Sequence, residues 1–265
     1  MTDGAVGSPP PVRDLVGHAD AALFDLDGVI TDTASLHMVA WGDMFRAFLA
    51  GRPGVSGDLA PYTDDDYFRH VDGKPRLDGI RAVLASRGID LPEGEADDPA
   101  EADTVHGLAR RKNDAFLRAL DEGVVAVYPG TIRLVQWLLD RSVPCAVVSS
   151  SRNARRVLEA VDLLDAFAHV VDGTTAQEEG LRGKPAPDTF VAAARRLGAR
   201  AAHTVAFEDA ESGVRAAADG GLRVVAVDRG AGHAALVDAG AELVVDDLAE
   251  LITVDASGAA APGGP

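Results

Sequence analysis

The sequence predicts an α/β fold in which a doubly wound parallel sheet carries an inserted helical domain. Two observations support this prediction. Short apolar runs alternate with longer amphipathic stretches through most of the chain, which is the pattern of parallel strands joined by helices. One block breaks the alternation, because residues 32–123 contain helical patterns and no convincing strand. Its length of ~90 residues exceeds an ordinary connection between strands, so we expect an insertion after the first strand.

The core is predicted from residues 1–32 and 124–265, and the helical insert from residues 33–123. Apolar runs predict buried strands at residues 21–25, 145–150, 169–173, 204–209, 223–228 and 242–247. Amphipathic stretches predict core helices at residues 131–141, 153–163, 187–199, 210–221 and 233–241, and insert helices at 33–51, 77–88 and 102–123. Several of these helices end near glycine, as helix C-termini often do.

The charge and composition exclude several classes of function. The chain of 265 residues has 25 basic and 42 acidic residues, a net charge of −17, and is 47% hydrophobic. Nucleic acids and anionic membranes need clustered Lys and Arg, so neither is an expected partner. No apolar run approaches the ~18 residues of a membrane helix, and the N-terminus lacks the regions of a signal peptide. We expect a cytoplasmic monomer whose partner is a small molecule.

Three features are predicted to be structural only. The single cysteine, Cys145, excludes an internal disulfide and lies in a predicted strand, so we expect an inert core thiol. The ends, residues 1–14 and 255–265, are rich in Pro, Gly and Ala and are predicted to be disordered. The polar residues 88–103 predict a solvated loop within the insert.

The stretch "FDLDGVITDT" places carboxylates at the end of the first strand. Asp25 and Asp27 stand two residues apart and can face the same way while Leu26 faces the core. A turn at Asp27–Gly28 explains one carboxylate but not a second one beside a buried run. Paired carboxylates suit Mg²⁺. One of them can also accept a phosphoryl group, and the other can exchange protons with a hydroxyl.

Three further groups follow later strands or precede helices. The serine run 149–151 can bind phosphate oxygens at a helix start, although one serine would serve as an ordinary N-cap. Lys184 of "GLRGKPAPDTF" can bind phosphate or remain on the surface. Glu208 and Asp209 can hold a metal or favour the following helix through its dipole. Ligands bind at the carboxyl ends of parallel strands, so we expect these groups to converge on Asp25.

The motifs together resemble a known family. "DLDGV", "SSS", "KPAPD" and "EDAESG", in this order and with a helical insert after the first, resemble the haloacid dehalogenase (HAD) superfamily. "FDLDGVITDTA" with His37 and Trp41, then "RKND" at 111–114 and "VYPG" at 127–130, resembles its β-phosphoglucomutase family. The resemblance covers nearly the whole chain and implies a Rossmann-like core with an α-helical cap.

The resemblance implies roles for the core residues. Asp25 would be the nucleophile and a metal ligand, and Asp27 the general acid/base whose backbone carbonyl also binds Mg²⁺. Asp209 would be a metal ligand, and Glu208 would be either a ligand or linked to the metal through water. Lys184 would bind the transferring phosphate.

Further roles lie at the edge of the cap. Ser149 would also bind the transferring phosphate, and Thr33 and His37 would couple cap closure to catalysis. Arg76 would grip the second, non-transferring phosphate. The other residues expected to bind substrate or phosphate are Lys112, Asn113, Trp41, Ser150, Ser151 and Asn153.

Some positions depart from the family pattern. The chain has Arg76-Leu77-Asp78-Gly79 where the pattern has a Ser after "RED". Its serine run replaces Ser-Ala-Ser, and Arg152 replaces the usual Lys. The cap is also longer around residues 51–66 and 91–103. These departures leave the core chemistry unchanged and the sugar specificity open.

The resemblance therefore implies a Mg²⁺-dependent phosphomutase that interconverts β-D-glucose 1-phosphate and D-glucose 6-phosphate. An aspartyl-phosphate at Asp25 and glucose 1,6-bisphosphate would be its intermediates. The alternative is a sugar-phosphate phosphatase with the same core and a leakier cap. A non-catalytic regulatory protein is the third possibility, but it would not need the set Asp25, Asp27, Lys184 and Asp209.

Overall fold

The structure is a computed structural model that describes residues 16–50, 56–123 and 125–252. These residues form a parallel sheet of six strands in the order β3-β2-β1-β4-β5-β6. The strands are β1 (Ala21–Phe24), β2 (Cys145–Val148), β3 (His169–Val171), β4 (Thr204–Glu208), β5 (Arg223–Val227) and β6 (Leu243–Val245). The sheet confirms the predicted α/β core, and β1, one of its two middle strands, leads to Asp25.

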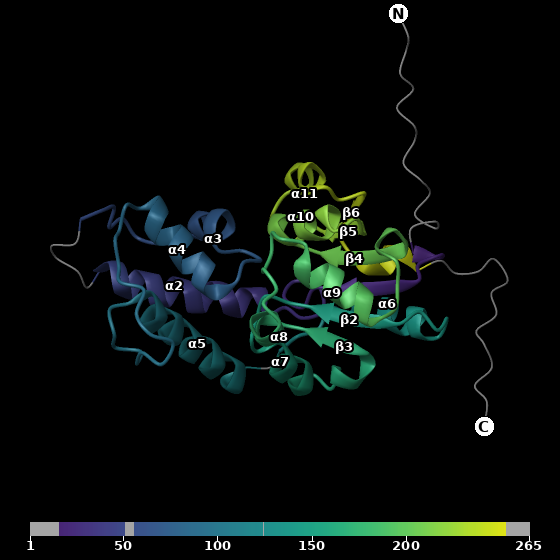
Figure 1. Cartoon of the computed structure of the whole chain (residues 1–265), viewed down its shortest axis with the longest axis horizontal. Coiled ribbons are helices and arrows are strands. Elements are labelled where there is room, and N and C mark those ends of the chain that lie inside the picture. Colours follow the sequence, from purple (N-terminus) through teal and green to yellow (C-terminus); the bar gives the residue numbers. More distant parts are fainter. Residues whose placement is uncertain (1–15, 51–55, 124, 253–265) are drawn as a thin grey trace, which may run out of the picture.

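Helices cover both faces of this sheet (Figure 1). Along β1, Ala22 and Phe24 join the apolar cluster on one face, and Leu23 joins the cluster on the other. The first face packs against α6 (Pro129–Leu139) and α7 (Ala154–Ala160), and the second against α9 (Asp188–Arg196), α10 (Glu211–Asp219) and α11 (His233–Ala239). Phe24 also stacks on Phe207 of β4, with the ring centroids 4.6 Å apart. The arrangement is doubly wound, as predicted.

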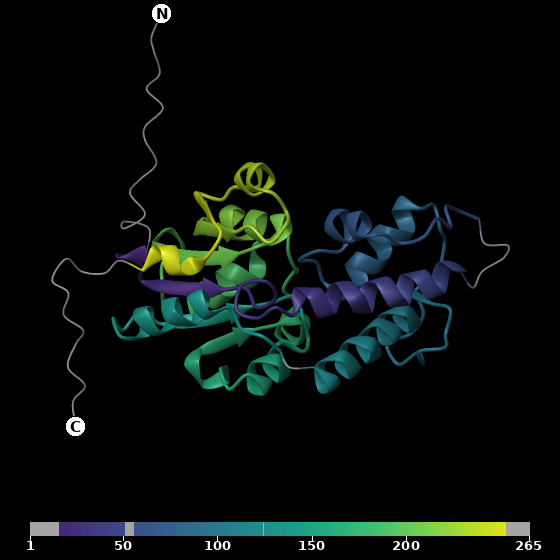
Figure 2. The same ribbon diagram turned by 180° about the vertical axis from the view of Figure 1, so that it is seen from behind.

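A separate group of helices lies beyond the end of the sheet at which the chain leaves β1 (Figures 1 and 2). They are α2 (Ala34–Ala50), α3 (Asp64–His70), α4 (Arg76–Ser86) and α5 (Val105–Glu122), called the cap below. The cap has its own apolar cluster, centred on Phe45, Ile80 and Leu108. The described residues between 32 and 123 contain no strand, as expected. The exact domain boundaries stay a prediction.

Two short helices are not among the predicted elements. In α3, Thr63 and Asp66 form a capping box within an acidic run, and that pair was the available signal. The strand predicted at 169–173 ends at Val171, because Asp172 starts α8 (Gly173–Glu178) instead. The Asp172 carboxylate accepts hydrogen bonds from the backbone of Thr174 (3.0 Å) and Thr175 (2.8 Å).

The remaining structural predictions have mixed outcomes. Residues 88–103 contain no helix or strand, as expected for a loop. Cys145 is buried, and burial raises the pKa of its thiol to about 12, which agrees with an inert core thiol. The predicted disordered tails lie outside the described residues. Within the described ranges, no helix combines the length and the apolar character that a membrane span requires.

The chain passes between the sheet and the cap along two adjacent segments, residues 30–32 and 126–128, which are called the hinge below. Thr31 forms an antiparallel bridge with Val127. The backbone N–H of Asp32 donates to the carbonyl of Ala126 (2.9 Å), and that of Tyr128 donates to the carbonyl of Ile30 (2.9 Å). The hinge therefore begins only a few residues after Asp27, so it joins the cap directly to the loop that carries the predicted catalytic residues.

Candidate active site

The carboxyl ends of three adjacent strands converge, as predicted. Asp25 follows β1, Ser149 follows β2, Glu208 ends β4, and Asp209 follows it. Carboxylate oxygens of Asp25, Glu208 and Asp209 lie within 4.8 Å of one another. The site lies where β1 meets β4, the point at which the order of strands in the sheet reverses, which is where ligands bind in such sheets.

Lys184 reaches into this carboxylate cluster from the loop before α9. Its Nζ donates to Asp25 Oδ1, to Glu208 Oε1 (2.5 Å) and to the carbonyl of Val148 (3.1 Å). Burial alone would lower the pKa of Lys184, but the carboxylates of Asp25 and Glu208 together outweigh it and raise the pKa. The lysine is therefore a fixed positive charge beside Asp25.

The cluster has more negative than positive charge. Asp25, Glu208 and Asp209 are 6%, 0% and 8% exposed, and the Lys184 ammonium contacts the first two of them. Burial raises the pKa values of Asp25 and Asp209, which means that the ionised forms need a further cation nearby. An oxygen-only donor set of this kind fits Mg²⁺.

Gly28 closes one side of this site. Its φ is +87°, and a Cβ there would lie 1.8 Å from Asp209 Oδ2. Only glycine therefore lets the loop after β1 approach this carboxylate. On the other side, Glu208 Oε2 accepts from the backbone N–H groups of Asp209 (3.0 Å) and Ala210 (3.1 Å). These bonds hold the Glu208 side chain in one orientation.

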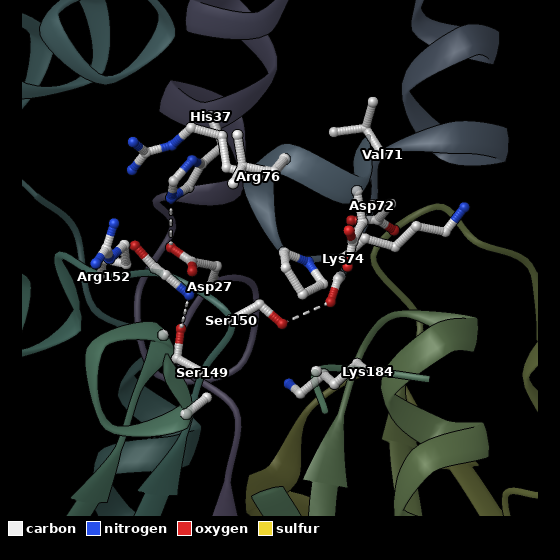
Figure 3. A pocket seen from close by; sticks show the side chains of 18 of the residues that line it. Asp27, His37, Val71, Asp72, Lys74, Arg76, Ser149, Ser150, Arg152 and Lys184 are labelled. Atoms are coloured by element: carbon white, nitrogen blue, oxygen red, sulfur yellow. Dashed lines mark hydrogen bonds and ion pairs between the residues drawn. The ribbon is translucent and has the colours of Figure 1, made fainter. Parts of the chain in front are cut away.

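Asp27 points toward His37 of the cap (Figure 3). Its Oδ1 accepts from Thr33 Oγ1 and lies 3.3 Å from His37 Nε2. Burial would raise the pKa of Asp27, but His37, Thr33 and the charge of Lys112 outweigh it and lower the pKa to about 2. Asp27 is therefore ionised in this arrangement, and its partners belong to the cap side of the hinge.

Three of the predicted site residues in the cap, His37, Lys112 and Trp41, lie in one group. The His37 ring stacks on Phe116 with centroids 4.1 Å apart, and its Nδ1 contacts Lys112 Nζ. Lys112 lies 5.2 Å from the centroid of the Trp41 ring. Burial, followed by the positive charge of Lys112, lowers the pKa of His37. Burial also lowers that of Lys112.

A second cationic group lies where the cap meets the core. Arg76 Nη2 donates to Asn113 Oδ1 (2.8 Å), and Asn153 Nδ2 donates to the same oxygen (3.0 Å). Burial and the charge of Arg152 lower the pKa of Arg76 to about 10. The structure thus brings together Arg76, Asn113 and Asn153, three residues that were each expected to bind substrate or phosphate. Arg152 was not predicted as a site residue. The replacement of the family's usual Lys at this position was the signal that could have indicated it.

The serine run has three different contacts. Ser149 is buried, and its Oγ accepts from the backbone of Ser151 (3.0 Å). Ser150 Oγ donates to the carbonyl of Gly73 in the cap (2.8 Å). Ser151 Oγ accepts from the backbone of Asn153 (3.2 Å). Ser150 therefore holds a cap loop in this arrangement, and the phosphate-binding role of all three serines stays a prediction.

Asp72, in the cap loop that also contains Gly73, is a site residue that was not predicted from the sequence. Its carbonyl accepts from Ser212 Oγ of the core (3.1 Å). Burial raises the pKa of its carboxyl to about 6, and the charge of Glu208 adds to the effect. In a sequence, "DGK" is ordinary turn chemistry, so nothing local distinguished this aspartate. It lines the cavity between the cap and the core.

These groups line one cavity of about 920 Å³ between the core and the cap. That size suits a small molecule bound with most of its surface buried. Lys184 and Ser149 enter from the core, and Arg76 and Asp72 enter from the cap (Figure 3). The predicted residues on the wall are Asp25, Asp27, His37, Trp41, Arg76, Lys112, Asn113, Ser149, Ser150, Ser151, Lys184, Glu208 and Asp209.

A family model of haloacid dehalogenase-like hydrolases matches residues 19–221. The chain belongs to this family, which confirms the predicted superfamily. The match begins just before β1 and includes the cap, Lys184 and the acids of β4. Fold, family and site together define an enzyme of the phosphomutase or phosphatase class, which sets aside the non-catalytic alternative.

Individual relatives give a closer comparison. A β-phosphoglucomutase of Mycobacterium tuberculosis is 45% identical over 253 residues, which cover 93% of this chain and 94% of that protein. A fructose-1-phosphate phosphatase of Escherichia coli is 30% identical over 205 residues, 77% of this chain and 94% of that protein. The crystal structure of a β-phosphoglucomutase from Clostridium difficile matches with a TM-score of 0.70 at 24% identity, over 88% and 93% of the two chains, and supports the fold. These matches confirm the resemblance to the β-phosphoglucomutase family.

Proposed function

We propose that this enzyme is a Mg²⁺-dependent phosphomutase that interconverts β-D-glucose 1-phosphate and D-glucose 6-phosphate. The observation that carries the proposal is that two cationic groups line one cavity. Lys184 lies beside Asp25 on the core, and Arg76 and Arg152 lie where the cap meets the core. A phosphatase needs a grip on one phosphate, whereas a mutase must hold two at once.

Asp25 is the residue that would carry the phosphoryl group. Phosphorylated Asp25 transfers the group to the 6-hydroxyl of β-glucose 1-phosphate, and glucose 1,6-bisphosphate forms. The bisphosphate then reorients so that its 1-phosphate lies at Asp25. An Asp25 carboxylate oxygen attacks this 1-phosphate, and glucose 6-phosphate leaves. Lys184 offsets the charge on the transferring group in both steps, and Ser149 offers it a hydroxyl.

When bound, Mg²⁺ would be held by Asp25, Asp209, Glu208 and the backbone carbonyl of Asp27, and would neutralise charge on the transferring phosphoryl group. The 6-hydroxyl loses its proton to the Asp27 carboxylate in the first transfer, and protonated Asp27 gives a proton to the sugar O1 that leaves the 1-phosphate in the second. To reach the sugar, Asp27 must leave Thr33 and His37. Because both partners lie on the cap side of the hinge, this exchange couples proton transfer to cap movement.

The cap would position the sugar and exclude water. Trp41, Lys112 and Asn113 line the same cavity, and the aromatic ring and amide suit the faces and hydroxyls of a sugar. Exclusion of water matters because an aspartyl-phosphate open to water hydrolyses. All these groups come from one chain, so a monomer suffices for the proposal.

A sugar-phosphate phosphatase is the second candidate. The relative from Escherichia coli is a phosphatase that matches 77% of this chain, so this core also occurs with hydrolytic activity. The two activities share Asp25 and Lys184 and differ in the fate of the phosphoryl group.

Phosphorus NMR separates the two candidates. The purified protein is incubated with Mg²⁺, β-glucose 1-phosphate and a catalytic amount of glucose 1,6-bisphosphate. We expect glucose 6-phosphate as the main product. Free phosphate in its place would identify a phosphatase and overturn the proposal.

A further inference from the structure

Arg229 follows β5 and connects three segments of the core. Its Nε donates to the carbonyl of Gly28 (3.0 Å), and its Nη1 donates to the carbonyl of Asp246 after β6 (3.2 Å). Its guanidinium carbon lies 3.8 Å from the centroid of the Tyr128 ring. Nothing in the proposed chemistry uses this arginine, yet its contacts include both the loop of Asp27 and the hinge.

The Gly28 contact lies in the catalytic loop. Gly28 follows Asp27 directly, and its N–H donates to the carbonyl of Thr31 (2.8 Å). The loop approaches Asp209 so closely that a Cβ at Gly28 would overlap its carboxylate. A shift of the Gly28 carbonyl would therefore move the backbone of Asp27 and disturb the close approach of this loop to Asp209.

The Tyr128 contact lies in the hinge. The Tyr128 N–H donates to Ile30, in one of the two segments that connect the sheet to the cap. Its hydroxyl donates to Asp32 Oδ1 (3.2 Å) in that segment. Tyr128, on whose ring Arg229 stacks, is thus hydrogen-bonded through both its N–H and its hydroxyl to the segment that enters the cap.

We propose that Arg229 is a positioning residue that ties the hinge to the catalytic loop, so that the two keep one relative placement during turnover. Arginine suits this role because its planar fork can donate two hydrogen bonds and stack on a ring at the same time. Lysine offers one flexible ammonium and no planar group. The proposal rests on the proposed function for its choice of reaction, since it concerns the loop of Asp27.

The test compares Arg229→Gln and Arg229→Lys with Arg223→Gln. Arg223 is at the opposite end of β5, where its side chain pairs with Glu242 (3.1 Å), and serves as the matched control. Each variant is assayed for hydrolysis of a small aryl phosphate and for conversion of β-glucose 1-phosphate. Circular dichroism and the melting temperature give the folded fraction, and kcat is expressed per folded enzyme.

We expect both Arg229 variants to lose roughly 10- to 100-fold in kcat on both substrates, as a misplaced catalytic group does. The KM for the aryl phosphate should change less than about twofold, because Arg229 lies outside the cavity wall. Arg223→Gln should retain the wild-type kcat. Because the stack on Tyr128 transmits the effect, Arg229→Gln/Tyr128→Leu should be no slower than Arg229→Gln alone.

Three results would overturn the proposal. They are a kcat for both Arg229 variants equal to that of Arg223→Gln, a change in KM alone, or a double variant that is slower than Arg229→Gln. If Arg229→Gln does not fold, Arg229→Lys decides, because it keeps the charge and loses the stacking. Aryl phosphate hydrolysis reports Asp25 chemistry whatever the natural sugar. A wild type that forms no glucose 6-phosphate would therefore refute the proposed function and leave the test of Arg229 intact.

Discussion

Arg76 and Asn113 are joined by a 2.8 Å hydrogen bond from the guanidinium to the amide oxygen. The same oxygen accepts from Asn153 on the core, so the bond belongs to the contact between the cap and the core. Arg76 is therefore held in place before any ligand arrives, and the charge of a second arginine, Arg152, lowers its pKa. Two arginine charges that act on each other in this way favour a bound dianion.

Arg76→Ala should lower mutase activity by on the order of 100-fold, about 3 kcal/mol, because a charged bond to the second phosphate is lost. Hydrolysis of a small aryl phosphate should be unchanged, because that substrate has no second phosphate. Steady-state kinetics on both substrates measure the difference. Arg69→Ala is the control, since Arg69 is an exposed cap arginine paired with Asp65. Equal losses on the two substrates, or none, would show that Arg76 does not hold the distal phosphate.

Metal removal should stop catalysis. Chelation with EDTA leaves the buried acids around Asp25 without their cation, and Mg²⁺ should restore activity better than Ca²⁺, whose larger radius misplaces the phosphate. Binding is also measurable without turnover: Mg²⁺ should raise the melting temperature of the wild type and have little effect on that of Asp209→Asn. Full activity after EDTA treatment would contradict the metal site.

Asp66 of the cap predicts a pH-dependent stability away from the active site. Its carboxylate accepts from Arg87 Nη2 (2.9 Å) and from the backbone of Thr63 (2.8 Å). Burial alone would raise the pKa of Asp66, but these bonds outweigh it and lower the pKa below 3.8. Asp66→Asn should lower the free energy of unfolding at pH 7 by about 1–3 kcal/mol, because Arg87 stays buried without its carboxylate.

The sign of the pH effect follows from the lowered pKa. The stabilisation is complete above the unfolded pKa, near pH 4, and is lost as the pH falls through the lower folded pKa. Urea unfolding from pH 7 to pH 3 should therefore show the gap between wild type and Asp66→Asn shrinking only below about pH 4. Asp65→Asn, in an exposed pair with Arg69, should cost under about 0.5 kcal/mol. A gap that widens on acidification would refute the assignment.

The core of the site was predictable because strand ends carry it. Asp25, Ser149 and Asp209 each follow a recognisable apolar run, and parallel strands bring such positions to one edge. Arg229, Asp72 and the direction in which Asp27 faces were not predictable. They depend on how loops distant in sequence meet, and "DRG" or "DGK" alone indicates only a turn. The helices α3 and α8 were missed because short helices depend on their caps more than on apolar periodicity.

The most direct test of the account follows the phosphoryl group on Asp25. Glucose 1,6-bisphosphate labelled with ³²P is mixed with the Mg²⁺-loaded enzyme, the reaction is quenched in acid, and peptides are analysed for labelled aspartate. The account predicts label on Asp25, which added β-glucose 1-phosphate chases back into sugar phosphate, and no label on Asp25→Asn. Label that passes only into free phosphate, or protein label that survives in Asp25→Asn, would contradict it.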